Sequence, residues 1–337
     1  MFSTTDTKSV DLLNSISIQF NRYFSIFIFL FGMTGNILNC FVLSQPTLRV
    51  NPCAYLFLAS SIANVISISF GLTTRILSGW NTDFTDTHSL ICKIRVFIMF
   101  VSRTTAFWLI AFATIDRWFT SCYQYQRRQM SSLKNSQRAT WCITVLSILF
   151  YCQVLYCYEA NIDAAPLRCY GRNVKCRLLT DITYASVTIF SPILIMSIFG
   201  FMTISNIRDT YSVSVLEKRI FKRNTEKHKT LSMTIGQRER WRKIDRYLRR
   251  VLFIQIILLI IFTLPQVIDK FYMTSAVHRK KSLLHTTIDT FIYNFVLLLT
   301  YAASGIPFYI YTLCGGSIFR TTLMTLLRMM IEKISCR

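Results

Sequence analysis

The chain has 337 residues and a formal net charge of +22, yet only 16% of its residues are charged, while 52% are hydrophobic, including 27 Phe and 16 Tyr. Soluble domains carry about 25% charged residues, so this composition excludes a soluble globular protein, and the apolar content excludes a disordered chain. The composition predicts apolar residues that face lipid and positive charge that is concentrated in particular loops.

Seven stretches meet the requirement of about 20 mainly apolar residues for a membrane-spanning helix. The first 23 residues are polar and lack the pattern of a cleavable signal peptide, so we expect the first span to act as the anchor. We predict an all-α membrane protein, a seven-transmembrane helix bundle, with an N-terminal segment 1–23, a transmembrane domain 24–313 and a C-terminal part 314–337. The predicted spans are Phe24–Leu43, Cys53–Leu72, Cys92–Asp116, Ala139–Tyr158, Leu179–Ile207, Leu248–Asp269 and Ile288–Leu313.

The distribution of basic residues predicts the orientation of these spans. Twenty-three Lys and Arg residues fall in the first, third and fifth loops and the C-terminal tail, against eleven in the N-terminus and the other loops. Cytoplasmic loops carry the excess of positive charge. We therefore expect the N-terminus outside and the C-terminus inside.

Short motifs mark the spans in chain order. The third span runs from Cys92 to Asp116-Arg117-Trp118. The marker residues of the other spans are Asn36 after Gly35 in the first, Asn64 in the second, Trp141 in the fourth, Pro192 in the fifth, Pro265 in the sixth, and Pro307-Phe308-Tyr309-Ile310-Tyr311 in the seventh.

This succession of motifs resembles the rhodopsin-family G-protein-coupled receptors over nearly the whole chain. The resemblance implies a non-enzymatic plasma-membrane receptor without a cofactor, which couples to heterotrimeric G proteins. Asn64 replaces the family's usual aspartate, which makes sodium regulation doubtful. Tyr311 matches the switching tyrosine, although a register one residue earlier places Ile310 there. The Ile244-Asp245-Arg246-Tyr247-Leu248 segment before the sixth span resembles invertebrate FMRFamide-like neuropeptide receptors.

The resemblance also implies roles at the cytoplasmic end. Arg117, beside Asp116, is the residue that engages the G protein, and Asp245 is a candidate partner that locks Arg117 in the inactive state. The alternative is that Asp245 pairs with Arg249 on its own helix. The fourteen basic residues between Arg208 and Arg250 indicate attraction to anionic lipid and a docking surface for G protein, receptor kinase or arrestin, rather than nucleic-acid binding.

Two features flank the helix bundle. Cys92 is expected to form a disulfide bond with the fourth loop, with Cys176 favoured and Cys169 as the alternative; the other cysteines, Cys157 among them, are interpreted as small hydrophobic residues rather than metal ligands. After the seventh span, apolar residues recur at helical spacing, which predicts an amphipathic interfacial helix. Its apolar residues are Phe319, Leu323, Leu326, Leu327, Met330 and Ile334.

The third span also suggests what the receptor binds. Met99 stands where amine receptors have an aspartate, and the seventh span has no lysine to bind retinal. Arg95, Met99 and Arg103 lie on one helix face. An arginine at membrane depth marks a functional site, unless it pairs with Asn64 or a backbone carbonyl.

We expect Arg103 to receive an anionic group of an extracellular ligand, most simply a peptide carboxylate. Arg75 and Arg95 would lie above it, and Met99, Gln266, Asp269 and Tyr301 would complete the pocket. A lipid or another small anion is the alternative ligand, and a seven-span transporter or channel is the alternative class of protein.

Overall fold

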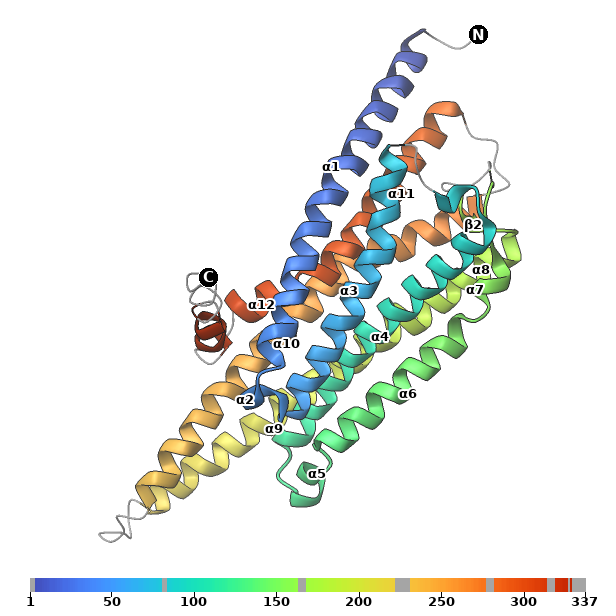
Figure 1. The fold of residues 1–337 in the computed structure, drawn as a ribbon. Coiled ribbons are helices and arrows are strands. Elements are labelled where there is room, and N and C mark those ends of the chain that lie inside the picture. The colour runs from blue at the N-terminus through green and yellow to red at the C-terminus, as the bar shows by residue number, and fades with distance from the viewer. Residues whose placement is uncertain are drawn as a thin grey trace, which may run out of the picture.

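Within the described residues, seven helices are long and apolar enough to cross a membrane, which confirms the predicted seven-helix bundle (Figure 1). The structure, a computed structural model, describes residues 4–80, 84–162, 168–221, 231–276, 282–313, 319–326 and 328. The membrane-length segments are Val10–Leu43, Pro52–Gly79, Ser89–Ser121, Leu133–Cys157, Val174–Asn206, Phe253–Ser275 and Leu283–Gly305.

The helices and strands follow one another along the chain without any large sheet. They are α1 (Thr4–Leu43), α2 (Pro46–Arg49), α3 (Pro52–Gly79), η1 (Phe84–Asp86), α4 (Ser89–Ser121), α5 (Tyr125–Gln129), α6 (Leu133–Tyr151), α7 (Val154–Cys157), β1 (Tyr158–Glu159), β2 (Tyr170–Gly171), α8 (Val174–Thr183), the π-helical η2 (Tyr184–Phe190), α9 (Ser191–Phe221), α10 (Leu231–Ser275), α11 (Leu283–Gly305) and α12 (Pro307–Leu313).

Helix α1 begins well before the predicted start of the first span at Phe24. The segment from Thr4 to Tyr23 contains no glycine or proline, so nothing in it breaks the helix. Arg22 fixes this part of α1 to the end of α3, because its Nη2 atom donates to the Gly79 carbonyl oxygen over 2.7 Å and its guanidinium group lies over the Trp80 ring.

Prolines set several of the helix boundaries. At the start of α3, the Asn51 side chain accepts hydrogen bonds from two backbone N–H groups, and Pro52 follows it in the first turn. The predicted seventh span, Ile288–Leu313, is two helices, because α11 ends at Gly305 and Pro307 starts α12. Pro192 follows the π-helical η2, whereas Pro265 lies inside the unbroken α10.

Helix α4 lies at the centre of the bundle, in contact with α3, α6 and α9. Lipid is as apolar as a leucine side chain, so close packing and hydrogen bonds between helices hold such a bundle together. Ser60 donates to the Ala106 carbonyl oxygen over 3.1 Å and links α3 to α4. Asn36 donates to the Ser304 carbonyl oxygen over 3.0 Å and links α1 to α11.

Residues 319–326 form a further helix beside the end of the seventh span. Phe319 and Leu323 are buried in a cluster with Val42 of α1 and Phe308 of α12. Arg320 is exposed and donates to the Thr312 carbonyl oxygen over 2.7 Å. The described part of the predicted amphipathic helix therefore has its apolar side against the bundle; the predicted stripe residues Leu327, Met330 and Ile334 lie outside the described residues.

A two-stranded hairpin covers one end of the bundle. Strands β1 and β2 pair antiparallel, with Glu159 opposite Tyr170, and β1 lies against α4. Burial raises the pKa of the Tyr158 and Tyr170 hydroxyls above their ordinary value, so both side chains stay neutral at physiological pH. The hairpin therefore covers this end with two neutral aromatic side chains, while its charged Glu159 lies 3.9 Å from Arg172.

Two disulfide bonds fix this hairpin, and they correct the favoured prediction for Cys92. The structure pairs Cys92 with Cys169, the alternative, and pairs Cys176 with Cys157. The hairpin is the physical reason, since it places Cys169, directly before β2, over the N-terminal end of α4. Cys176 lies in the first turn of α8, next to the end of α7. The interpretation of Cys157 as a small hydrophobic residue is wrong.

Candidate functional site

Arg103 lies in α4 with its side chain completely buried. Its Nη1 atom donates a hydrogen bond to the Thr300 hydroxyl over 3.1 Å, and its guanidinium carbon lies 4.2 Å from the centre of the Tyr301 ring. Its Nε and Nη2 atoms have no hydrogen-bond partner within the described part of the chain. Burying polar groups without partners is costly, so an acceptor that reaches these two donors would stabilise the buried guanidinium group.

Tyr301 contacts both α3 and α4, through the packing of its ring and through its hydroxyl group. The hydroxyl donates to the Met99 sulfur over 2.9 Å. A Cβ atom on Gly71 of α3 would lie only 2.1 Å from the same hydroxyl oxygen, so only glycine leaves room for this ring. Met99, Arg103 and Tyr301 therefore form one buried cluster.

Gln266 of α10 joins this cluster through Tyr184 of η2. The Tyr184 hydroxyl donates to the Gln266 side-chain oxygen over 2.7 Å, and Tyr184 lies within electrostatic range of Arg103. Four of the residues predicted to bind the ligand thus come together from three helices, α4, α10 and α11. They are Met99, Arg103, Gln266 and Tyr301.

The other two predicted arginines bond different partners from those of Arg103. Arg75 of α3 is buried and donates to the Asn294 side-chain oxygen over 3.2 Å. Asp269 of α10 is buried as well.

Arg95 does not continue the inward face of α4 toward Arg103. It is half-buried and donates to the backbone carbonyl oxygens of Phe70 and Gly71 on α3, over 3.0 and 3.3 Å. The Arg95 side chain therefore does not point inward with those of Met99 and Arg103, because it turns sideways toward α3.

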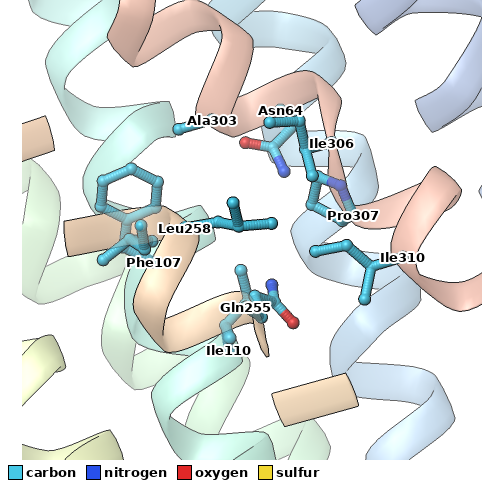
Figure 2. Close-up of a pocket in the computed structure, with 10 residues that line it drawn as sticks. Asn64, Phe107, Ile110, Gln255, Leu258, Ala303, Ile306, Pro307 and Ile310 are labelled. Carbon is cyan, nitrogen blue, oxygen red and sulfur yellow. The ribbon is translucent and has the colours of Figure 1, made fainter. Parts of the chain in front are cut away.

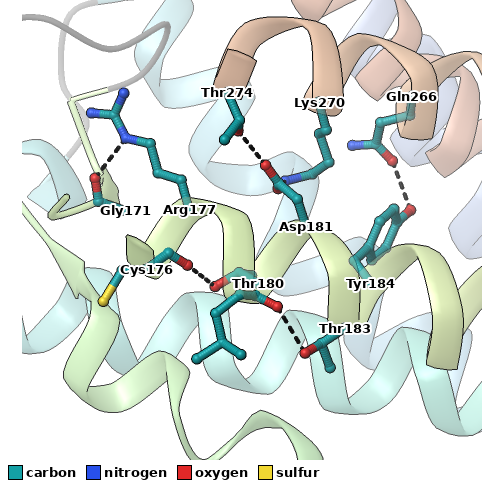
Figure 3. A network of polar contacts seen from close by, with 11 residues as sticks. Gly171, Cys176, Arg177, Thr180, Asp181, Thr183, Tyr184, Gln266, Lys270 and Thr274 are labelled. Carbon is teal, nitrogen blue, oxygen red and sulfur yellow. Dashed lines mark hydrogen bonds and ion pairs between the residues drawn. The ribbon is translucent and has the colours of Figure 1, made fainter. Parts of the chain in front are cut away.

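A buried ion pair that the sequence analysis missed lies beside this cluster (Figure 3). The Lys270 ammonium group is 2.8 Å from an Asp181 carboxylate oxygen, and both side chains are almost completely buried. Thr274 donates to the other carboxylate oxygen over 2.5 Å. The rings of Phe100, Tyr170 and Tyr184 surround the ammonium group at 5.7 to 5.9 Å.

This ion pair corrects the placement of Lys270 in a loop, because α10 continues to Ser275. A signal for it was present in the sequence. Asp181 falls inside the predicted fifth span, and an acidic residue in a span needs a basic partner. The pair joins α8 to α10 at the same end of the bundle as the hairpin.

A small cavity is lined in part by Phe107 and Ile110 of α4, which fall between Arg103 and Arg117 in the chain (Figure 2). It holds about 10 Å³ reachable by the centre of a water molecule, which is room for about one water. Asn64 points into it, and its side-chain oxygen has no hydrogen-bond partner among the described residues. The apolar lining comes from α4, α10 and the α11–α12 break, and includes Phe107, Ile110, Leu258, Pro307 and Ile310.

Arg117 and Asp116 lie at the far end of α4, and each bonds a neighbouring segment. Arg117 donates to the Asn51 side-chain oxygen over 3.0 Å, at the start of α3. Ser131, which follows α5, donates to Asp116 over 2.6 Å. The side chains of Asp245 and Tyr311 lie outside the described residues, so the predicted lock and switch stay predictions.

Trp141 was predicted to be a structural residue of the fourth span. The exposed Trp141 lies on the outer face of α6, with 73% of its surface accessible, rather than in the bundle interior. Within the described part of the chain, no group of three or more His, Cys, Asp or Glu side chains could hold a metal ion.

Seven membrane-length helices around a buried polar centre define a multi-pass membrane protein. No protein-family model matches the chain. Over 146 residues it is 25% identical to a protein described as a neuromedin U receptor homolog of Caenorhabditis elegans. The matched segment covers 42% of this chain and 34% of that protein. The chain spans about a third of the length of the curated relative it matches. The seven apolar helices and this similarity together support a G-protein-coupled receptor; a FMRFamide-like specificity is not part of that finding.

Proposed function

We propose that this protein is a non-enzymatic plasma-membrane receptor that binds an extracellular peptide and activates a heterotrimeric G protein. The N-terminus lies outside in this proposal, so the hairpin and Lys270 are on the extracellular side. The similarity to a neuromedin U receptor homolog supports a peptide ligand. The observation that carries the proposal is Arg103, a buried cation with two donor atoms that have no hydrogen-bond partner among the described residues.

The chemistry of Arg103 narrows the ligand group. A guanidinium group presents its donors as a planar fork that matches a carboxylate, and such bonds strengthen when water is excluded. The Tyr301 ring covers one side of the guanidinium group, and Thr300 already occupies one nitrogen. A carboxylate or a carbonyl oxygen of the ligand would satisfy the two open nitrogens. A small anionic lipid offers the same group and is the competing ligand.

The test begins with a screen of a neuropeptide library, with acidic lipids included, against cells that carry a promiscuous G-protein reporter. Arg103→Ala should then weaken the potency of the active ligand roughly 10- to 100-fold, since a hydrogen bond to a charged group contributes about 1.5–3 kcal/mol. Arg22→Ala is the matched control, because Arg22 bonds the α3 backbone at Gly79 and is not among the residues predicted to bind the ligand.

Arg103→Lys, which keeps the charge but not the fork, should lie between the two variants. Surface expression of each variant is measured by an epitope tag. Unchanged potency in a well-expressed Arg103→Ala receptor would remove Arg103 from the binding site.

A further inference from the structure

The buried ion pair of Lys270 and Asp181 has no role in the proposed contact with Arg103. The Lys270 ammonium group is 2.8 Å from an Asp181 carboxylate oxygen (Figure 3). Three aromatic rings surround the ammonium group at 5.7 to 5.9 Å, those of Phe100, Tyr170 and Tyr184. A carboxylate and aromatic faces are the groups with which proteins bind an organic cation. The pair is therefore a complete cation site that is occupied by a side chain of the protein itself.

Lys270 does not use all the hydrogen-bonding capacity of this site. Among the described residues, its ammonium group makes one hydrogen bond, to Asp181, although an ammonium group can donate three. The hydroxyl of the buried Tyr170 has no hydrogen-bond partner in the described part of the chain. A cation with more donors, such as a guanidinium group, would therefore suit the same surroundings at least as well as Lys270 does.

The energetics of the pair decide which kind of ligand group can open it. Removing Lys270 alone leaves the Asp181 carboxylate as an uncompensated charge in a medium of low dielectric constant, which is strongly destabilising. An incoming cation supplies the missing charge itself, whereas a neutral or anionic group does not. A cationic group can therefore replace Lys270 beside Asp181 without that cost.

The position of Lys270 gives its side chain somewhere to go. Helix α10 ends at Ser275, and the five residues from Lys270 to this end correspond to about 7.5 Å along the helix axis. A lysine carries its ammonium group on a flexible stem and extends it toward water where water is within reach. The displaced ammonium group can therefore move to the end of α10 while the backbone of the helix stays in place.

We propose that Asp181 and the surrounding rings bind a cationic group of the ligand, an ammonium or a guanidinium group, and that Lys270 occupies this site until the ligand displaces it. The inference rests on the proposed function, because the pair lies at the end of the bundle through which the ligand would enter. The exchange breaks the ion pair that joins α8 to α10. Binding of the cation therefore loosens α10 at this end.

Tyr184 connects this cation site to Arg103. Its ring centre is 5.7 Å from the Lys270 ammonium group, and its hydroxyl group donates to Gln266 in the cluster that contains Arg103. One ligand can therefore place an anionic group at Arg103 and a cationic group at Asp181. A peptide carries both kinds of group, whereas an acidic lipid without a cation would leave Lys270 in place.

The first test empties the site in the purified full-length chain. Lys270→Ala removes the ammonium group and its stem, so the variant should unfold at a lower temperature than the wild type. Added n-butylammonium replaces the lost group and should raise the unfolding temperature of the variant again. At about ten times its dissociation constant, it should lower the unfolding equilibrium constant roughly tenfold. The neutral 1-butanol at the same concentration should have no such effect.

Two variants serve as matched controls for this rescue. Lys270→Ala/Asp181→Asn keeps the emptied space but lacks the carboxylate, and it should not respond to n-butylammonium. Lys134→Ala removes an exposed lysine of α6 and should not respond either. Absence of rescue in Lys270→Ala, or equal rescue by 1-butanol, would overturn the proposal.

The second test measures displacement in the wild-type chain and needs no variant that folds. Lys270 is buried, so an amine-acetylating reagent should modify it slowly, as followed by peptide mass spectrometry. Nα-acetyl-argininamide should speed this modification severalfold at about 50 mM, since so small a fragment binds weakly. The citrulline analogue has nearly the same shape without the charge and should leave the rate unchanged. The exposed Lys134 should react at the same rate throughout.

An unchanged rate at Lys270, or the same acceleration by the citrulline analogue, would show that Lys270 is a fixed structural partner of Asp181 and would overturn the proposal. No receptor ligand or G protein enters either measurement, so their failure leaves the proposed receptor function to its own test.

Discussion

At the residue scale, the pair of Lys270 and Asp181 carries a large energetic consequence. Two buried charges attract strongly, but removing one of them leaves the other without compensation in a medium of low dielectric constant. Thr274 adds a hydrogen bond to Asp181, and three aromatic rings face the ammonium group of Lys270. Replacing both residues together is therefore expected to cost little stability, whereas replacing either one alone is expected to cost much.

We expect Lys270→Met and Asp181→Leu each to lower stability by about 3–5 kcal/mol. The double variant should lose much less than the sum of the two single losses, because no unpaired charge remains. Thermal unfolding of the solubilised protein, followed by tryptophan fluorescence, gives the double-mutant cycle. Strictly additive losses would show that the two groups do not act as a pair.

The buried cluster shows which residues of the candidate site can be predicted from one amino-acid sequence. A polar residue inside an apolar span stands out along the sequence, which is why Arg103 was identified with Met99 on the same face. Its partner Thr300 was not identified, since a partner across the bundle depends on helix rotation and distance. Lys270 was missed because it follows directly after the predicted end of a span, where a basic residue is ordinary.

At the scale of elements, the hairpin of β1 and β2 depends on two disulfide bonds. Cys92–Cys169 spans 77 residues of sequence, and Cys157–Cys176 spans 19. A crosslink stabilises by restricting the unfolded chain, and more so for a longer loop. The longer loop should therefore contribute more.

Removing Cys157–Cys176 by paired serine substitutions should cost up to about 3 kcal/mol, and removing Cys92–Cys169 up to about 4.5 kcal/mol, by the loop-closure relation. Thermal unfolding of the two variants measures the order. Peptide mapping by mass spectrometry under non-reducing conditions checks the pairing itself. A Cys92–Cys176 peptide would contradict the connectivity.

Helix existence was predictable from the sequence, but several helix ends were not. Apolar length alone identifies a span, so all seven were found. The continuation of α1 before Phe24 involves polar residues that hydropathy ignores. Pro307 can be read from the sequence, but a proline can either kink a helix or end it. In the structure α11 ends at Gly305, before Pro307. The hairpin strands are two residues each, too short for a periodic pattern.

At the scale of the whole molecule, α4 connects two polar regions across the bundle. Arg103 and its aromatic neighbours lie toward the hairpin, and Arg117 lies at the other end. Between them, Phe107 and Ile110 line a small cavity together with residues of α10 and α12. A ligand that binds Arg103 and shifts α10 would change the packing around this cavity. A switch between two conformations of the bundle requires only that the ligand bind one of them more tightly.

The most direct test of this account is nucleotide exchange by a purified heterotrimeric G protein, measured as GTPγS binding with the full-length receptor in nanodiscs and the ligand from the screen. The account predicts ligand-stimulated exchange that Arg117→Ala abolishes while ligand binding persists, and that Arg103→Ala reduces through weaker ligand binding. Ligand binding without any exchange in the wild-type receptor, or solute flux through the reconstituted chain, would contradict the receptor function.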